Sequence, residues 1–140
     1  MNPNLRFRRA TALMAGAVLS LSAGFVQAAD VQLVGAQETP PVSTTATGVA
    51  SITIASDRSV SGNVKTTGID GTMAHIHTGA PKEAGPPIVT LTKGDNGAWN
   101  VPSGAKLTDE QYATFKAGNL YVNVHSAAHP GGEIRGQLKP

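Results

Sequence analysis

The sequence predicts an all-β domain, a β-sandwich with one short helix before the penultimate strand. Short runs rich in Val, Ile and Thr recur along the chain, and 16 glycines and 9 prolines punctuate them at intervals typical of sandwiches. Only one segment carries both a helix start signal and a helix stop signal. The length of 140 residues suits one domain with a modest core.

The segment 1–28 is predicted to be a secretory signal peptide, followed by the domain at 29–140. Residues 2–9 carry three arginines and no acidic residue, residues 10–26 are mostly apolar, and Val26-Gln27-Ala28 has the small-x-Ala form of a cleavage site. Glycines and serines within the apolar stretch disfavour a permanent membrane anchor. We therefore expect a periplasmic or secreted protein that keeps no stable membrane anchor after cleavage.

The charge of the expected mature domain is close to zero. The whole chain has 11 Lys and Arg against 9 Asp and Glu, a net charge of +2. Three of these basic residues belong to the signal peptide, so 8 basic and 9 acidic side chains remain. This balance gives no support to nucleic acid or an anionic membrane as a partner. The chain has no cysteine, which excludes thiolate metal sites, a lipid-bearing cysteine anchor and cysteine nucleophiles.

The strands are predicted from β-branched or alternating runs bounded by turn residues. Tandem proline makes residues 35–42 an extended loop, because proline cannot donate a ladder hydrogen bond. Glycines and prolines make residues 79–87 a second loop. The predicted strands are 31–34, 46–55, 60–66, the strand that carries His75 and His77, 88–91, 98–101, 120–125 and 133–138.

The predicted helix begins after Thr108 and ends before Gly118. Thr108 has Gln111 three positions later, and together they form the two partners of a capping box. Asp109 and Glu110 lie in the first turn, where the helix dipole favours acidic residues. A glycine at position 118 is the usual terminator of a helix.

All four histidines lie in two short stretches of the chain. Alternation along a strand puts His75 and His77 on one face, about 6–7 Å apart at Cα, with Ile76 pointing into the core. In the strand 120–125, alternation puts His125 on the face opposite the apolar side chains. We therefore expect His75, His77 and His125 on the outer surface of a sheet, open to solvent or to a partner, where they converge on one metal ion.

The predicted metal ligands are His75, His77, His125 and His129. His129 follows in a loop that either folds back to supply a fourth ligand or leaves the ring solvated. Met73 shares the parity of the first two, so its thioether is either a soft ligand for Cu(I) or a packing residue. Imidazole ligands without thiolates suit Cu(II), Zn(II) or Ni(II), and copper binds most tightly in that series. We expect copper, with zinc as the alternative ion; the plainer interpretation is that these are surface or hydrogen-bonded histidines.

Glu133 and Arg135 share one face of the last predicted strand with Gln137. The plain interpretation is a surface ion pair or a set of cross-strand contacts, which contribute little to stability. The functional interpretation is that Arg135 guides an anion toward the metal, or that Glu133 accepts a hydrogen bond from a ligand imidazole.

These motifs resemble the CHRD domain family, named after repeats in chordin and common in exported bacterial proteins. The matching stretches follow the family's order and span nearly all of the expected domain. The family pattern does not usually require histidine at the position of His129. The stretches are LVGAQETPPV at 33–42, AHIHTG at 74–79, GNLYVNVH at 118–125 and PGGEIRGQL at 130–138.

The motifs are in turn similar to those of copper,zinc superoxide dismutase: a His-x-His strand, a later Val-His strand and an arginine near the C-terminus. This resemblance implies a Greek-key β-sandwich that holds copper on its outer face through His75, His77 and His125. It also implies, more loosely, an anion-guiding role for Arg135. No histidine lies between His77 and His125, so a bridging imidazolate and a zinc site of that enzyme's kind have no candidates.

We therefore expect an exported metal-binding protein that sequesters or delivers copper. One alternative is a non-catalytic protein-interaction module of the CHRD type, in which the histidines only knit the outer face. Another is a redox enzyme similar to superoxide dismutase, although no residue is assigned as catalytic. The expected partner is the metal ion, and a second copy of the chain or another exported protein is left open.

Overall fold

The computed structural model describes residues 29–140, so the predicted signal peptide lies outside the described residues. The described chain confirms the predicted all-β class, with nine strands, one α-helix and one 3-10 helix. The elements are β1 (Val31–Val34), η1 (Gly35–Gln37), β2 (Thr47–Ile54), β3 (Val60–Thr67), β4 (Gly71–Thr78), β5 (Pro87–Thr90), β6 (Thr92–Lys93), β7 (Ala98–Asn100), α1 (Asp109–Lys116), β8 (Leu120–Ser126) and β9 (Ile134–Gln137).

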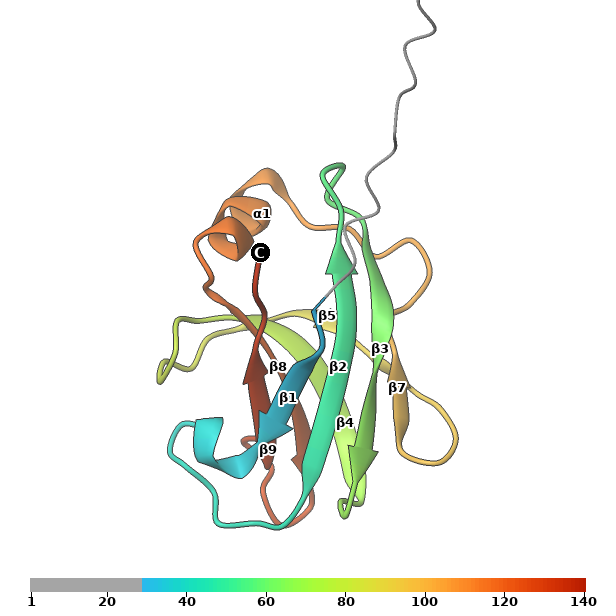
Figure 1. Cartoon of the computed structure of the whole chain (residues 1–140), viewed down its shortest axis with the longest axis vertical. Coiled ribbons are helices and arrows are strands. Elements are labelled where there is room, and N and C mark those ends of the chain that lie inside the picture. Colours follow the sequence, from blue (N-terminus) through green and yellow to red (C-terminus); the bar gives the residue numbers. More distant parts are fainter. Residues whose placement is uncertain (1–28) are drawn as a thin grey trace, which may run out of the picture.

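All nine strands form one antiparallel sheet with the order β5-β4-β8-β9-β1-β2-β3-β7-β6. The join in its middle is narrow, because β1 and β9 align at a single pair, Val34 with Arg135, whereas β2 and β3 align over eight residue pairs. Figure 1 shows the sheet folded over, with β2 and β3 lying across from β4 and β8. The result is a nearly closed sandwich, as the sequence predicts.

The hydrophobic core lies between the two halves of the folded sheet. The predicted alternation buries Ala50 and Ile52 on β2, and Val124 on β8 is fully buried. Trp99 on β7 reaches the opposite half: a Cβ added at Gly71 on β4 would touch both the Trp99 indole and Val124. Each fully buried large apolar side chain contributes about 1.5–3 kcal/mol of transfer free energy, so this contact helps to hold the halves together.

Helix α1 confirms the predicted capping box. The Thr108 hydroxyl accepts a hydrogen bond from Gln111 N at 3.1 Å, and Gln111 Oε1 accepts one from Thr108 N at 2.9 Å. Gly118 follows the helix with φ +79°, the left-handed conformation of a helix terminator. Figure 1 shows α1 at one end of the sandwich, where it leads the chain into β8.

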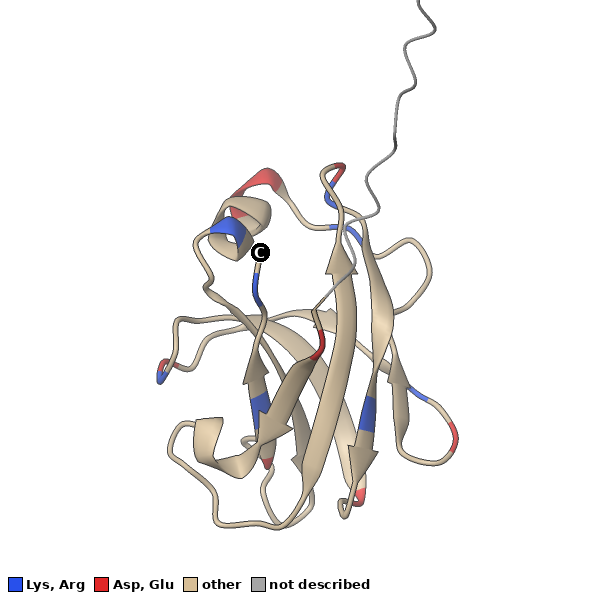
Figure 2. Ribbon diagram, viewed as in Figure 1, with Lys and Arg blue, Asp and Glu red and all other residues tan. Residues whose placement is uncertain are grey.

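The sequence did not predict η1 or β6. The proline-rich loop begins with a tight turn in which Glu38 N donates to Gly35 O at 3.0 Å. Strand β6 has only two residues, too few for a periodic pattern to reveal it. Acidic and basic residues are spread over the loops and the helix, and strands β3 and β9 each carry a basic position as well (Figure 2).

Within residues 29–140, no helix combines the length and the apolar character needed to cross a membrane.

Candidate metal centre

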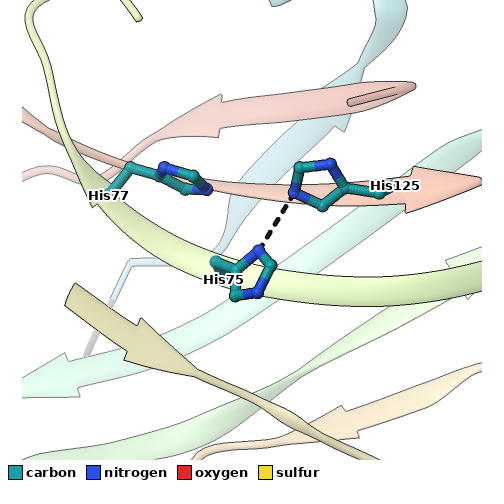
Figure 3. Close-up of side chains that lie close together, drawn as sticks. All are labelled: His75, His77 and His125. Carbon is teal, nitrogen blue, oxygen red and sulfur yellow. Dashed lines mark hydrogen bonds between the residues drawn. The ribbon is translucent and has the colours of Figure 1, made fainter. Parts of the chain in front are cut away.

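Three of the four histidines come together on the β4–β8 pair. His75 and His77 lie on β4 and His125 lies on β8, and one ligand nitrogen from each lies within 4.8 Å of the others. The centre of the His75 ring is 5.4 Å from that of His77 and 5.0 Å from that of His125. Figure 3 shows the three rings gathered on one side of the strands. Ile76 is fully buried on the other side, which confirms the predicted alternation.

Backbone carbonyls fix the protons of two of the rings. His77 Nδ1 lies 2.9 Å from Gly85 O, and His125 Nδ1 lies 2.9 Å from Pro130 O. A carbonyl oxygen can only accept, so each Nδ1 carries a proton and donates it. The Nε2 atoms of His77 and His125 therefore carry no proton, and their lone pairs are what a metal ion binds.

His75 completes the group through its own Nδ1. This atom lies 3.0 Å from His125 Nε2 (Figure 3). Because His125 Nε2 is an acceptor, His75 Nδ1 is the donor in this hydrogen bond. A shift of the His75 proton from Nδ1 to Nε2 frees a third lone pair without changing the charge of the ring.

The separations of these nitrogens suit a single ion. Metal–nitrogen bonds of about 2.0–2.1 Å place two ligands that are 3.0 Å apart at an angle of about 90°. Two such ligands cannot lie more than about 4.1 Å apart. The group, whose nitrogens lie within 4.8 Å of one another, therefore needs to contract by less than about 1 Å.

Burial keeps the histidines in the form that binds metal. Desolvation lowers the pKa of His75, and the neighbouring His125 and His77 rings lower it further. Desolvation also lowers the pKa of His77, although its hydrogen bond to Gly85 O partly opposes this. Metal ions bind neutral imidazole, so a lowered pKa reduces the competition from protons.

The sheet face that carries the histidines is covered, which corrects the expectation of an open surface. His77 and His125 are only 7% and 6% exposed, and His75 is half-buried. The loop between β4 and β5 folds back over this face, where Gly85 N donates to Tyr121 Oη at 3.3 Å. Alternation gives the side of a sheet on which a residue lies, but it does not say what covers that side.

Three side chains are stacked beside this loop. The His77 ring lies nearly parallel to the Tyr121 ring, at 4° and 4.8 Å between centres. The Arg135 guanidinium lies 3.5 Å from the centre of the same Tyr121 ring. His77 and Arg135 come from β4 and β9, the two neighbours of β8. The stack therefore ties the orientation of a candidate ligand to both adjacent strands.

Arg135 uses its donors to hold the loop. Its guanidinium is buried, with the residue only 1% exposed. Nη1 donates to Glu83 O at 2.8 Å, and Nη2 donates to Ala80 O at 2.9 Å and to Gln137 Oε1 at 3.1 Å. The predicted anion-guiding role is not supported, because these donors are already engaged.

Asn123 and Glu38 extend the polar face, and sequence reasoning missed both as site residues. Asn123 lies between Tyr121 and His125 on the same face of β8 and is 2% exposed. Its Nδ2 donates to Glu38 Oε1 at 3.3 Å. Glu38 is 6% exposed, and desolvation raises its pKa. The shared parity of Asn123 and His125 was the one signal in the sequence; nothing local links residues 85 positions apart.

A cavity of about 430 Å³ borders this extension of the face. Glu38, Arg135 and Gln137 line one part of it, and Pro81 and Lys82 of the covering loop line another. None of the three clustered histidines lines the cavity. The cavity is therefore distinct from the histidine cluster, and Glu38 links it to Asn123.

His129, Met73 and Glu133 lie outside the group of three. His129 is half-buried in the turn before β9, and its backbone carbonyl accepts a hydrogen bond from the turn. Met73 is 47% exposed and pairs across the strands with His125. Glu133 accepts a hydrogen bond from the Thr44 hydroxyl at 2.7 Å. Backbone carbonyls orient the His77 and His125 rings. The functional interpretation gives that role to Glu133, and the plain interpretation gives Glu133 a surface or cross-strand contact.

One family model matches this chain across the described fold. It is that of the CHRD domain, and the match covers residues 29–138. No curated protein and no solved structure matches the chain. With this family match spanning nearly every described residue, from before β1 to the end of β9, the chain belongs to the CHRD domain family.

Proposed function

We propose that this protein binds one copper ion through His75, His77 and His125 and sequesters or delivers copper outside the cytoplasm. The convergence of three imidazole nitrogens within 4.8 Å of one another carries the proposal. Support also comes from His77 Nε2, which is buried and has no hydrogen-bond partner. A buried polar atom without a partner is costly, and a bound cation removes that cost.

Copper is favoured over zinc by the chemistry of the ligands. The 3.0 Å between His75 Nδ1 and His125 Nε2 is the length of a hydrogen bond, and it is close both to a 90° angle at an ion and to the separation of about 3.3 Å at a tetrahedral ion. Copper has the higher affinity for nitrogen ligands, so zinc is the alternative ion.

The unequal burial of the ligands supports a role in transfer as well as storage. His77 and His125 are held by carbonyls and buried, whereas His75 is half-buried and bonds only to another ring. Exchange of the ion would therefore begin on the His75 side. The predicted signal peptide would place the protein in a compartment where cytosolic thiols do not control copper.

Titration of the purified protein with Cu(II), followed by electron paramagnetic resonance and calorimetry, tests the proposal. We expect one ion per chain, nitrogen couplings from three imidazoles and a dissociation constant far below micromolar. Loss of a single hydrogen bond to a ligating side chain lowers metal affinity by about 10- to 100-fold. The double variant His75→Ala/His125→Ala removes two ligands, so it should weaken binding by more than this. The matched control His129→Ala should leave binding unchanged. Micromolar or weaker binding that the double variant retains would contradict the proposal.

A non-catalytic interaction module is the second candidate. Membership of the CHRD family is compatible with it, and the His75–His125 hydrogen bond ties β4 to β8 without an ion. On this alternative, the double variant loses stability, but copper does not raise the melting temperature of the unaltered protein. If copper does bind tightly, a superoxide assay on the loaded protein separates a carrier from a redox enzyme.

A further inference from the structure

Two buried acceptors without a donor lie beside the candidate metal centre. Among residues 29–140, His77 Nε2 and Asn123 Oδ1 are the two buried side-chain atoms that have no hydrogen-bond partner. Asn123 on β8 is the cross-strand partner of His75 on β4, so its side chain lies on the face that carries the three histidines. His77 Nε2 has no proton because Nδ1 donates to Gly85 O, and an amide oxygen has none to give. A cation or a hydrogen-bond donor is therefore needed to satisfy these two acceptors.

The amide of Asn123 is held in one orientation. Its Nδ2 donates to Glu38 Oε1 at 3.3 Å, and a carboxylate selects the NH₂ group because it only accepts. The backbone of Gly132 packs on this hydrogen bond so closely that a Cβ there would meet both Glu38 Oε1 and Asn123 Nδ2. Asn123 Oδ1 is thereby turned away from Glu38 and fixed as a free acceptor.

We propose that Asn123 positions a water molecule as the fourth ligand of the copper ion. The inference rests on the proposed metal function. The ion takes the lone pair of His77 Nε2, the water oxygen binds the ion, and one water proton is donated to Asn123 Oδ1. Both orphan atoms are satisfied at once. Asn123 is thus a positioning residue that does not itself touch the ion, and Glu38 acts through it.

A water ligand has a consequence for copper transfer. Water is the only one of the four ligands that the protein does not hold covalently. A donor group from a copper acceptor can replace it without displacing an imidazole. Loss of the water would leave one coordination position open, and the incoming ligand would reach it from the side of the half-buried His75.

Deuterium electron spin echo modulation of the Cu(II)-loaded protein in D₂O tests the inference. The unaltered protein should show strongly coupled, exchangeable deuterons of one bound water together with three imidazole couplings. Asn123→Leu, which keeps the size but removes the acceptor, should lose the strongly coupled deuterons and keep the imidazole couplings. Asn123→Asp retains an acceptor oxygen and should keep both signals. Asn63→Leu, at an exposed asparagine on β3, is the matched control and should change neither.

Unchanged water deuterons in Asn123→Leu would overturn the inference. Their absence from the unaltered protein would also overturn it, because direct binding of the ion by the Asn123 amide gives no water deuterons. Glu38→Gln covers the case in which Asn123→Leu does not fold. A glutamine amide can also donate to Asn123 Oδ1, so this variant should weaken the water coupling, and full retention would count against the inference. Absence of imidazole couplings from the unaltered protein would instead show that the metal proposal itself has failed.

Discussion

At the scale of single residues, two consecutive glycines in the turn before β9 have different roles. Gly132 has φ +128°, a conformation that residues with a side chain rarely adopt, and it packs against the Glu38–Asn123 hydrogen bond. A Cβ at Gly131 would have no atom within 4 Å. Of these two positions, only 132 requires glycine, because of its φ and because Glu38 and Asn123 leave no room for a side chain.

Gly132→Ala should lower the free energy of unfolding by about 1–3 kcal/mol, because alanine must adopt a strained conformation and displace the Glu38–Asn123 pair. Gly131→Ala, the adjacent control, should change it by less than about 0.5 kcal/mol. Denaturant unfolding of both variants measures the difference. Equal small effects would show that the close packing at Gly132 has no energetic consequence.

At the scale of elements, the loop between β4 and β5 supports the histidine cluster. Side chains of β9 form hydrogen bonds to this loop. Arg135 donates to the carbonyls of Ala80 and Glu83, and Gln137 Nε2 donates to Gly79 O at 2.8 Å. The same loop supplies the carbonyl that fixes the His77 proton. A change on β9 is therefore transmitted to His77 on β4.

Arg135→Met keeps most of the apolar stem and removes every donor. It should speed amide hydrogen exchange in the loop and lower the free energy of unfolding by about 2 kcal/mol, because several part-buried hydrogen bonds between Arg135 and the loop are lost. Arg58→Met is the matched control, since Arg58 forms an exposed ion pair with Asp109 that is worth at most about 1 kcal/mol. Loop exchange that stays as slow in Arg135→Met as in Arg58→Met would contradict this support.

At the scale of the whole molecule, features set by neighbouring residues were predictable and distant contacts were not. The capping box of α1 depends on Thr108 and Gln111, three positions apart, and it was predicted correctly. The parity of β4 and β8 is equally local, and it placed His75, His77 and His125 on one face. Strand boundaries also came within one or two residues, because turn residues mark them.

The sequence could not predict that the sheet face carrying the three histidines is covered. This covering depends on Arg135 reaching the Ala80 carbonyl, 55 positions away, and on Asn123 reaching Glu38, 85 positions away. Hydrogen bonds of this kind leave no periodic pattern. The long apolar alternation in β8 indicates one buried face, whereas both faces of that strand are buried. The sequence therefore predicted the three histidines that meet, together with His129, which lies outside the group, but it did not predict the enclosed site in which backbone carbonyls orient two of the rings.

The most direct test of the central claim is a crystal structure of the copper-loaded protein with anomalous scattering recorded at the copper edge. We predict one anomalous peak at about 2.0–2.1 Å from the Nε2 atoms of His77 and His125 and from Nδ1 of His75. No peak between these three rings, or a peak only at His129, would contradict the account.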